Sequence, residues 1–277
     1  MSLSFSTCGQ GTQVDTYTKS EIDNKISQSE AKTYTKSEID VMISASGFRN
    51  YYLGNQFTTE QAEMIAAGDF KDLRYGDYWN VDGIYFRICD DTNWYKRRGD
   101  TEFTKDALLI MPDENILKAD GSTKYMKDTN DTTGAYASTK YRATYRAQAK
   151  KKFTDFFGAA HIASYRGLIA TAVSNGGSSN WASVDCDVEL PTEDMLFGAP
   201  HCNNGFYGNG SFYGQLKLFR ERPEFIVAKT RNGDREESWE QNVVSASWFA
   251  AVGFQGCASA GSASAAIIGC RPFALLI

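Results

Sequence analysis

The sequence predicts an α+β protein made of a short helical segment at residues 1–47 and a larger mixed domain at residues 48–277. Three observations predict this. The eight residues TYTKSEID occur at 16–23 and again at 33–40, each time with the signature of a helix start. Asp82-Gly83 lies between two runs of aromatic and β-branched residues, which is typical of a β-hairpin. A stretch with helical periodicity at 138–157 is followed by short strands and loops.

Each TYTKSEID copy carries the residues that begin a helix. In the first copy, Thr18 lies three residues before Glu21, which is the spacing of a capping box. Tyr17 precedes the cap and Ile22 lies one turn into the helix, as in a hydrophobic staple, and Ile26 extends the same face. The second copy repeats the arrangement with Tyr34, Thr35, Glu38, Ile39 and Ile43. We therefore expect two short helices, each with one narrow apolar stripe.

Neither short helix is expected to be stable alone, because isolated helices below about 12–15 residues are marginal in water. The 17-residue offset between the copies matches neither a 7-residue nor an 11-residue repeat, so one continuous coiled coil is not expected. We expect the stripe to be buried against copies of itself in other chains. The alternative is a disordered leader rich in Ser and Thr.

The composition of the chain limits its class. Hydrophobic residues make up 42% of the sequence and the net charge is −5, with no long basic run, so we expect a substantial core and no nucleic-acid surface. No apolar run approaches 18 residues and no leader pattern occurs, so we expect no membrane span and no signal peptide. The six Cys lie far apart without a CxxC motif, so we expect thiols and no zinc or other cofactor.

No catalytic motif is present, and we expect the protein not to be an enzyme. The alternating acidic residues Asp185, Asp187 and Glu189 fit the solvated face of a strand at least as well as an acid–base pair. His201 next to Cys202 is a single pair in a loop, which is more often incidental than a metal or catalytic site.

The larger domain contains several local signals. Thr58 followed by Gln61 predicts a helix start, and Gly68 its end. Aromatic and small residues recur every four positions in the helix at 138–157, and we expect this stripe to be core: Tyr141, Tyr145, Ala149, Phe153 and Phe157. Residues 175–180 and 203–214 carry loop signals. The second loop holds four aromatic residues that would either bind a partner or fold inward: Phe206, Tyr207, Phe212 and Tyr213.

The C-terminal segment is unusual because residues 241–270 carry no charge and are dominated by Ala, Ser and Gly. Large apolar residues at its start and a final apolar strand at 269–277 indicate that it is ordered. Two interpretations are open: an ordered segment for ligand binding, or a closely packed pair of small-residue strands. Arg271 is the only charge in the closing strand, and we expect it to be buried and structural.

The TYTKSEID copies resemble the repeats of phage tail-fibre and baseplate proteins, where such repeats form short trimeric stalks. This resemblance implies a homotrimer, other tail proteins as partners, and a protein that is made in the host cytoplasm and incorporated into the virion.

The C-terminal half carries a second resemblance through the stretches LPTEDMLFG at 190–198, GQLKLF at 214–219, FAAV at 249–252 and GCRPF at 269–273. These are similar to a family of domains found in prophage genes, and to the C-type-lectin-like domain of formylglycine-generating-enzyme type in variable proteins of diversity-generating retroelements. The resemblance implies a C-type-lectin-like, receptor-binding domain with a diversified C-terminal segment. The catalytic Cys residues of the related enzyme cannot be matched, so its activity is not implied.

The segment departs from the family pattern at Glu240-Gln241-Asn242, where the family has Leu-Arg-Ser, as a diversified surface would. We expect a bacterial surface receptor, protein or glycan, to bind residues 240–268, with Trp248 as the anchor. The expected contact residues are Glu240, Gln241, Asn242, Val243, Val244, Ala246, Trp248, Phe254, Gln255 and Ser259. The alternative function is a tail-associated glycan hydrolase that uses Asp185, Asp187 and Glu189.

Overall fold

The computed structural model describes residues 48–91, 100–199, 201 and 214–277. Phe48–Ile277 forms one compact unit, which is the range expected for the larger domain. The two expected stalk helices lie outside the described residues. Within the described part, no helix has the length and apolar character needed to cross a membrane.

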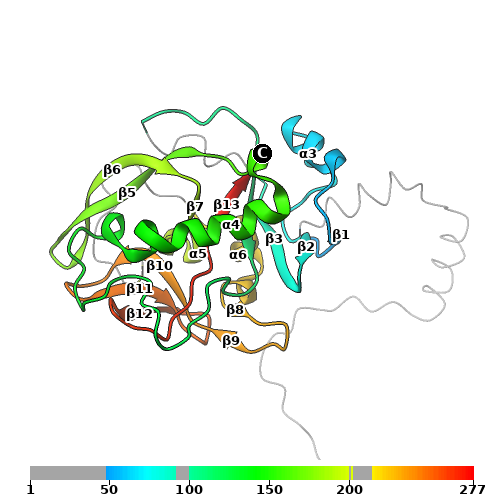
Figure 1. The fold of residues 1–277 in the computed structure, drawn as a ribbon. Helices are drawn as coiled ribbons and strands as arrows, with labels where there is room; N and C mark the ends of the chain where they lie inside the picture. The colour runs from blue at the N-terminus through cyan, green and yellow to red at the C-terminus, as the bar shows by residue number, and fades with distance from the viewer. Residues whose placement is uncertain (1–47, 92–99, 200, 202–213) are drawn as a thin grey trace, which may run out of the picture. The chain divides into compact units, whose positions relative to one another are not determined.

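The centre of this unit is a six-stranded sheet with the order β1-β2-β3-β4-β13-β7 (Figure 1). Its strands are β1 (Tyr52–Gly54), β2 (Tyr78–Val81), β3 (Ile84–Asp90), β4 (Leu108–Pro112), β7 (Val188–Glu189) and β13 (Phe273–Leu276). β1 is parallel to β2 and the other neighbours are antiparallel. The last strand of the chain is therefore an interior strand, which confirms the expected buried closing strand.

Two of the local predictions are confirmed in the first part of the domain. Asp82 and Gly83 have positive φ angles of 49° and 93° and form the two-residue turn between β2 and β3. Helix α3 (Thr59–Ala66) begins with a capping box, because Thr58 Oγ1 accepts from the Gln61 backbone N–H and Gln61 Oε1 accepts from that of Thr58. Gly68 follows the helix with a φ of 67°.

The expected amphipathic helix covers one face of the main sheet. A short helical turn η2 (Tyr136–Ser138) leads to a π-helical turn η3 (Tyr141–Tyr145), which continues as α4 (Arg146–Phe157). The Phe153 ring lies 5.0 Å from the Phe86 ring, and the Phe157 ring lies 5.3 Å from that of Trp79. The aromatic stripe is therefore core, as expected, although Tyr145 is only half-buried.

A long hairpin of β5 (Tyr165–Ser174) and β6 (Gly177–Cys186) follows α4. Only Asn175 and Gly176 form its turn, so the loop expected at 175–180 is wrong for residues 177–180, which belong to β6. Gly177 already pairs with Ser174, and the ladder continues without interruption to Ser179. The remaining short elements are η4 (Ala159–His161), α5 (Glu193–Phe197), α6 (Lys217–Glu221), η5 (Pro223–Phe225), β8 (Ala228–Lys229) and β9 (Arg235–Glu236).

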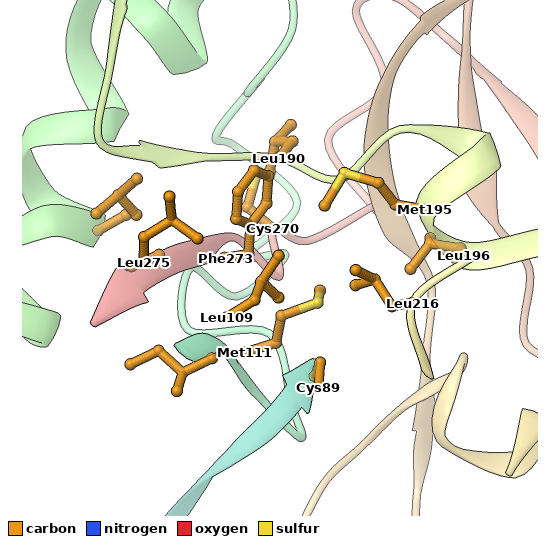
Figure 2. Packing of buried hydrophobic residues seen from close by; sticks show 14 of the residues in the cluster. Cys89, Leu109, Met111, Leu190, Met195, Leu196, Leu216, Cys270, Phe273 and Leu275 are labelled. Carbon is orange, nitrogen blue, oxygen red and sulfur yellow. The ribbon is translucent and has the colours of Figure 1, made fainter. Parts of the chain in front are cut away.

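The core joins segments that are distant in sequence. Figure 2 shows side chains from β3, β4 and β13 meeting those of the 190–196 segment and Leu216. Cys89 and Cys270 are buried free thiols within this cluster, as expected for most of the Cys residues. The described fold is mixed α/β with more sheet than helix, which agrees with the α+β class.

Candidate functional site

Residues 238–262, most of which belong to the uncharged segment 241–270, form a three-stranded antiparallel sheet, called here the C-terminal sheet. Its strands are β10 (Ser238–Val243), β11 (Trp248–Val252) and β12 (Ala258–Ser262). It lies beyond the main sheet, near α5 and β8 in Figure 1. Gly269 attaches it to the closing segment, since the Trp239 N–H donates to the Gly269 carbonyl at 3.0 Å and the Gly269 N–H donates to that of Glu237 at 3.1 Å. The expected binding segment is therefore ordered and joined to the core.

Small residues in the middle of this sheet are required by packing. A Cβ at Gly261 would lie 2.4 Å from Ile268 Cδ1 and 2.7 Å from Trp239 Cη2. Ala250 and Ala251 on β11 are buried. The interpretation as a closely packed small-residue strand pair thus holds for the interior of the sheet.

Four of the ten expected contact residues are wrong, because Glu240, Gln241, Asn242 and Val243 are buried on β10 and cannot reach a partner. Their backbone and side chains bind neighbouring segments instead. The Gln241 N–H donates to the Pro191 carbonyl at 3.0 Å, Asn242 Oδ1 accepts from the Glu193 N–H at 3.0 Å, and the Val243 N–H donates to Ser178 Oγ at 2.9 Å.

The remaining expected residues lie at the rim of the C-terminal sheet, which consists of the ends of its strands, the loops that join them and the exposed Ile267 that follows β12. Trp248 at the start of β11 is 45% exposed and Phe254 in the β11–β12 loop is 56% exposed. Ala246 and Gln255 are exposed, whereas Val244 and Ser259 are half-buried. Sequence reasoning missed Ile267, which is 69% exposed and lies in the same uncharged segment.

The loop that precedes Trp248 is held by hydrogen bonds from distant residues. Thr132 donates from its backbone N–H to the Ala246 carbonyl at 3.0 Å and from Oγ1 to the Ser245 carbonyl at 2.8 Å. The Ala263 N–H donates to the Ser247 carbonyl at 2.8 Å. This loop presents the Trp248 ring from a backbone with fixed contacts, which limits the entropy lost when a partner binds.

Arg271 is 2% exposed and joins the closing segment to the end of β4 and to η5. Its Nε donates to the Pro112 carbonyl at 2.5 Å, and its Nη1 donates to the carbonyls of Phe225 and Ile226 at 2.7 and 2.9 Å. Burial lowers its pKa, which Asp113 partly offsets. This geometry agrees with the expected structural role.

Glu240 is a buried carboxyl group, and neither of its oxygens has a hydrogen-bond partner among the residues that the structure describes. Burial raises its pKa well above the ordinary value, and the nearby carboxylates of Glu193 and Asp194 raise it further. The sequence signal for Glu240 was only its departure from the family pattern, which does not distinguish a surface residue from a buried one.

Each of the three carboxylates of the alternative hydrolase hypothesis has a basic partner. Asp185 pairs with Arg166 at 3.0 Å and Asp187 with Lys150 at 2.9 Å. Glu189 departs from the expected solvated face: it is fully buried and accepts from Arg146 Nη1 at 2.8 Å and the Tyr136 hydroxyl at 2.9 Å. Burial raises the pKa of Glu189, while Arg142 and Arg146 oppose this shift. β6 ends at Cys186 and Glu189 lies on β7, so the three do not share one continuous strand.

The other candidates add no further site. His201 is exposed beside the Phe197 ring, and its neighbour Cys202 lies outside the described residues. Among the residues with described positions, no group of three or more His, Cys, Asp or Glu is placed to hold a metal ion. The aromatic loop residues Phe206, Tyr207, Phe212 and Tyr213 also lie outside the described part, and their role stays a prediction.

Comparison with known proteins gives no relative. No family model, no curated protein and no solved structure matches this chain. Any functional conclusion therefore depends on the residues themselves.

Proposed function

We propose that the chain is a receptor-binding protein of a phage tail fibre or tail tip, and that it attaches to the bacterial surface without catalysis. One observation carries the binding part. Within the described part of the chain, five large hydrophobic side chains are exposed, and three of them belong to the uncharged C-terminal segment: Trp248, Phe254 and Ile267.

The composition of this rim supports a role in binding. Interface cores are depleted of charge and enriched in aromatic residues, and Trp is the residue most favoured at energetic hot spots. The proposed contact set now comprises Val244, Ala246, Trp248, Phe254, Gln255, Ser259 and Ile267. Glu240, Gln241, Asn242 and Val243 are excluded from it because they are buried.

The repeats at 16–23 and 33–40 support the assignment to a phage tail through their resemblance to stalk repeats. A trimer would hold three C-type-lectin-like domains at high effective concentration, so that weak single contacts give strong attachment. Diversification of the exposed rim belongs to the same proposal. A neighbouring reverse-transcriptase gene with a near-copy of the 3′ end of this gene would support it, and the absence of both would contradict it.

Adsorption of the purified full chain to a panel of bacterial strains tests the proposal. Trp248→Ala should reduce adsorption at least about tenfold, which corresponds to about 1.4 kcal/mol, with an unchanged melting temperature. Tyr51→Ala is the matched control, because Tyr51 is 59% exposed and lies outside the C-terminal segment.

Two outcomes would contradict the proposal. Unchanged adsorption of Trp248→Ala would remove the rim as the receptor surface. Release of soluble saccharide from cell walls by the unmodified protein would contradict the absence of catalysis and favour the hydrolase alternative.

A further inference from the structure

A separate cavity of about 160 Å³ lies beside the turn of the β2–β3 hairpin. Its wall is formed by this turn, by the end of β4, by residues 224–231 and by Arg271, and none of its lining residues belongs to the rim of the C-terminal sheet. Sites that enclose a whole ligand are typically about 300–1,000 Å³. The cavity is therefore of a size for one charged group of a ligand whose remainder lies outside.

The acidic residues of the cavity are already neutralised. Each of its three carboxylates has a basic partner that does not line the cavity. These pairs are Asp113 with Arg87, Glu114 with Lys118, and Glu224 with Arg222. Lys118 also pairs with Glu236 at 3.1 Å, so Glu114 shares its partner, while Asp113 and Glu224 are paired with arginines. The acidic side of the wall is thus largely paired, and we expect the basic side to determine the preference of the cavity.

Two of the three basic residues of the cavity lack such a partner among the described residues, and Arg271 has only a long ion pair with Asp113. Neither Lys229 nor Arg231 has a carboxylate within 4.0 Å in the described part of the chain, and Lys229 acts on Glu224 only from a greater distance. Arg271 Nη2 is buried, has no hydrogen-bond partner, and lies 3.9 Å from Asp113 Oδ1. An anionic group would complete the hydrogen bonding of this guanidinium, and charge-assisted bonds of this kind are stronger than neutral ones.

Arg231 is seated on the hairpin turn itself. A Cβ at Gly83 would lie 2.7 Å from Arg231 Nη1, so the guanidinium packs where only glycine leaves room. Lys229 is fixed through its backbone, whose N–H donates to the Asp113 carbonyl at 2.8 Å. Arg231 therefore contacts the turn through its guanidinium, whereas Lys229 is fixed through its backbone only.

A row of tyrosines leads away from the cavity along the outer face of the sheet. The Tyr85 ring lines the cavity and lies 4.8 Å from the Tyr78 ring, which lies 5.8 Å from that of Tyr52. Trp79 and Phe86, which alternate with these residues, point to the opposite face and pack on α4. Tyr52 is 47% exposed, and Tyr78 and Tyr85 are half-buried. Tyrosine rings have an apolar face and a polar hydroxyl, which suits the face and the edge of a sugar ring.

We propose that this cavity and the tyrosine row bind an acidic saccharide. Its carboxylate or phosphate lies between Lys229, Arg231 and Arg271, and the adjoining sugar rings lie against Tyr85 and Tyr78. This site is distinct from the rim of the C-terminal sheet and does not depend on the receptor function proposed for that rim.

Calorimetric titration of the full chain with trigalacturonic acid tests the charge requirement. The methyl-esterified trisaccharide is the matched control, because it keeps the rings and loses the carboxylates. We expect the acid to bind at least tenfold more tightly than the ester. A second set of titrations uses glucose 6-phosphate and inorganic phosphate. If glucose 6-phosphate binds more tightly than the uronate, phosphate is the natural anion. Three results would each overturn the proposal. The acid and the ester could bind equally, neither anionic sugar could bind at millimolar concentration, or inorganic phosphate could bind as tightly as the sugar phosphate.

Variants locate the site. Arg231→Gln and Lys229→Gln should each weaken binding about tenfold, and Tyr85→Ala, which loses the ring, should weaken it more than Tyr85→Phe, which loses only the hydroxyl. Trp248→Ala should leave the affinity for the acidic saccharide unchanged. A failure of the saccharide proposal is therefore distinguishable from a failure of the receptor proposal. Arg231 is exposed, and its replacement should not change the melting temperature. Wild-type affinity in Arg231→Gln would overturn the assignment.

Discussion

Arg271 Nη1 donates to the carbonyl oxygen of Phe225 at 2.7 Å, which links the closing segment of the chain to residues 46 positions earlier. The same guanidinium also bonds the Pro112 carbonyl at the end of β4. One side chain therefore joins three segments that meet at the centre of the domain. The charge of Arg271, two residues before β13, is tolerated because its guanidinium donates to three backbone carbonyls.

Replacement of Arg271 tests this link. Arg271→Ala leaves these buried carbonyls without a donor, and the loss of one partner from a buried charged network costs about 3–5 kcal/mol. At about 2–4 °C per kcal/mol for a domain of this size, the melting temperature should fall by on the order of 10 °C. Arg220→Ala is the control, because its side chain is 59% exposed and its ion pair with Glu221 is long, at 3.7 Å. An unchanged melting curve for Arg271→Ala would contradict the structural role.

Glu240 predicts a pH dependence of stability. Its pKa is raised in the folded state, so the folded protein binds this proton more tightly than the unfolded chain does. Below the unfolded pKa of about 4.3, Glu240 is protonated in both states and does not destabilise the fold. As pH rises from there toward the folded pKa, the free energy of unfolding falls by up to about 1.4 kcal/mol per pH unit. Glu240→Gln removes the titration, so the variant should gain stability relative to the wild type as pH rises from 4 to 8.

Melting temperatures of both proteins across this pH range measure the effect. Glu60→Gln on the exposed side of α3 is the control and should run parallel to the wild type. If the difference in melting temperature between the wild type and Glu240→Gln stays constant with pH, Glu240 does not titrate between pH 4 and 8.

The packing of Gly261 gives a prediction for the interior of the C-terminal sheet. Gly261→Ala places a methyl group against Ile268 Cδ1 and the Trp239 ring, and overpacking of this kind costs about 1–3 kcal/mol. Ile268→Val removes the Cδ1 atom, so the double variant should recover part of the loss. Chemical denaturation of the single and double variants measures this coupling. Additive losses in the double variant would show that the two positions do not share the space.

The two helices expected at the TYTKSEID repeats lead us to predict a homotrimer. Changing Ile22, Ile26, Ile39 and Ile43 to Asn should weaken a homotrimer, because it removes the apolar stripe of both helices. Ser20→Asn with Ser37→Asn is the control, because it changes the same helices off the stripe. Light scattering after size-exclusion chromatography reports the mass. A monomer for the unmodified chain would contradict the trimer, and a trimer that survives the four substitutions would place its interface in residues 48–277.

Several elements could be predicted because their causes are local. The Asp82-Gly83 turn, the Thr58 capping box and the aromatic stripe of α4 depend on residues within about four positions of one another. Arg271 could be assigned to the interior because it is a lone charge in an apolar strand. These features need no knowledge of which distant segment packs against them.

The tertiary structure alone decided which side chains of the candidate site reach the surface. Glu240 and Asn242 are buried because the 190–194 segment crosses β10, and Glu189 is buried because Tyr136 and Arg146 from another part of the chain cover it. Trp248 is exposed at the first position of β11, where it pairs with Ser262 of β12, and Phe254 is exposed in the loop after β11. Burial depends on contacts between segments separated by tens of residues, and a local pattern of charge or periodicity does not contain those contacts.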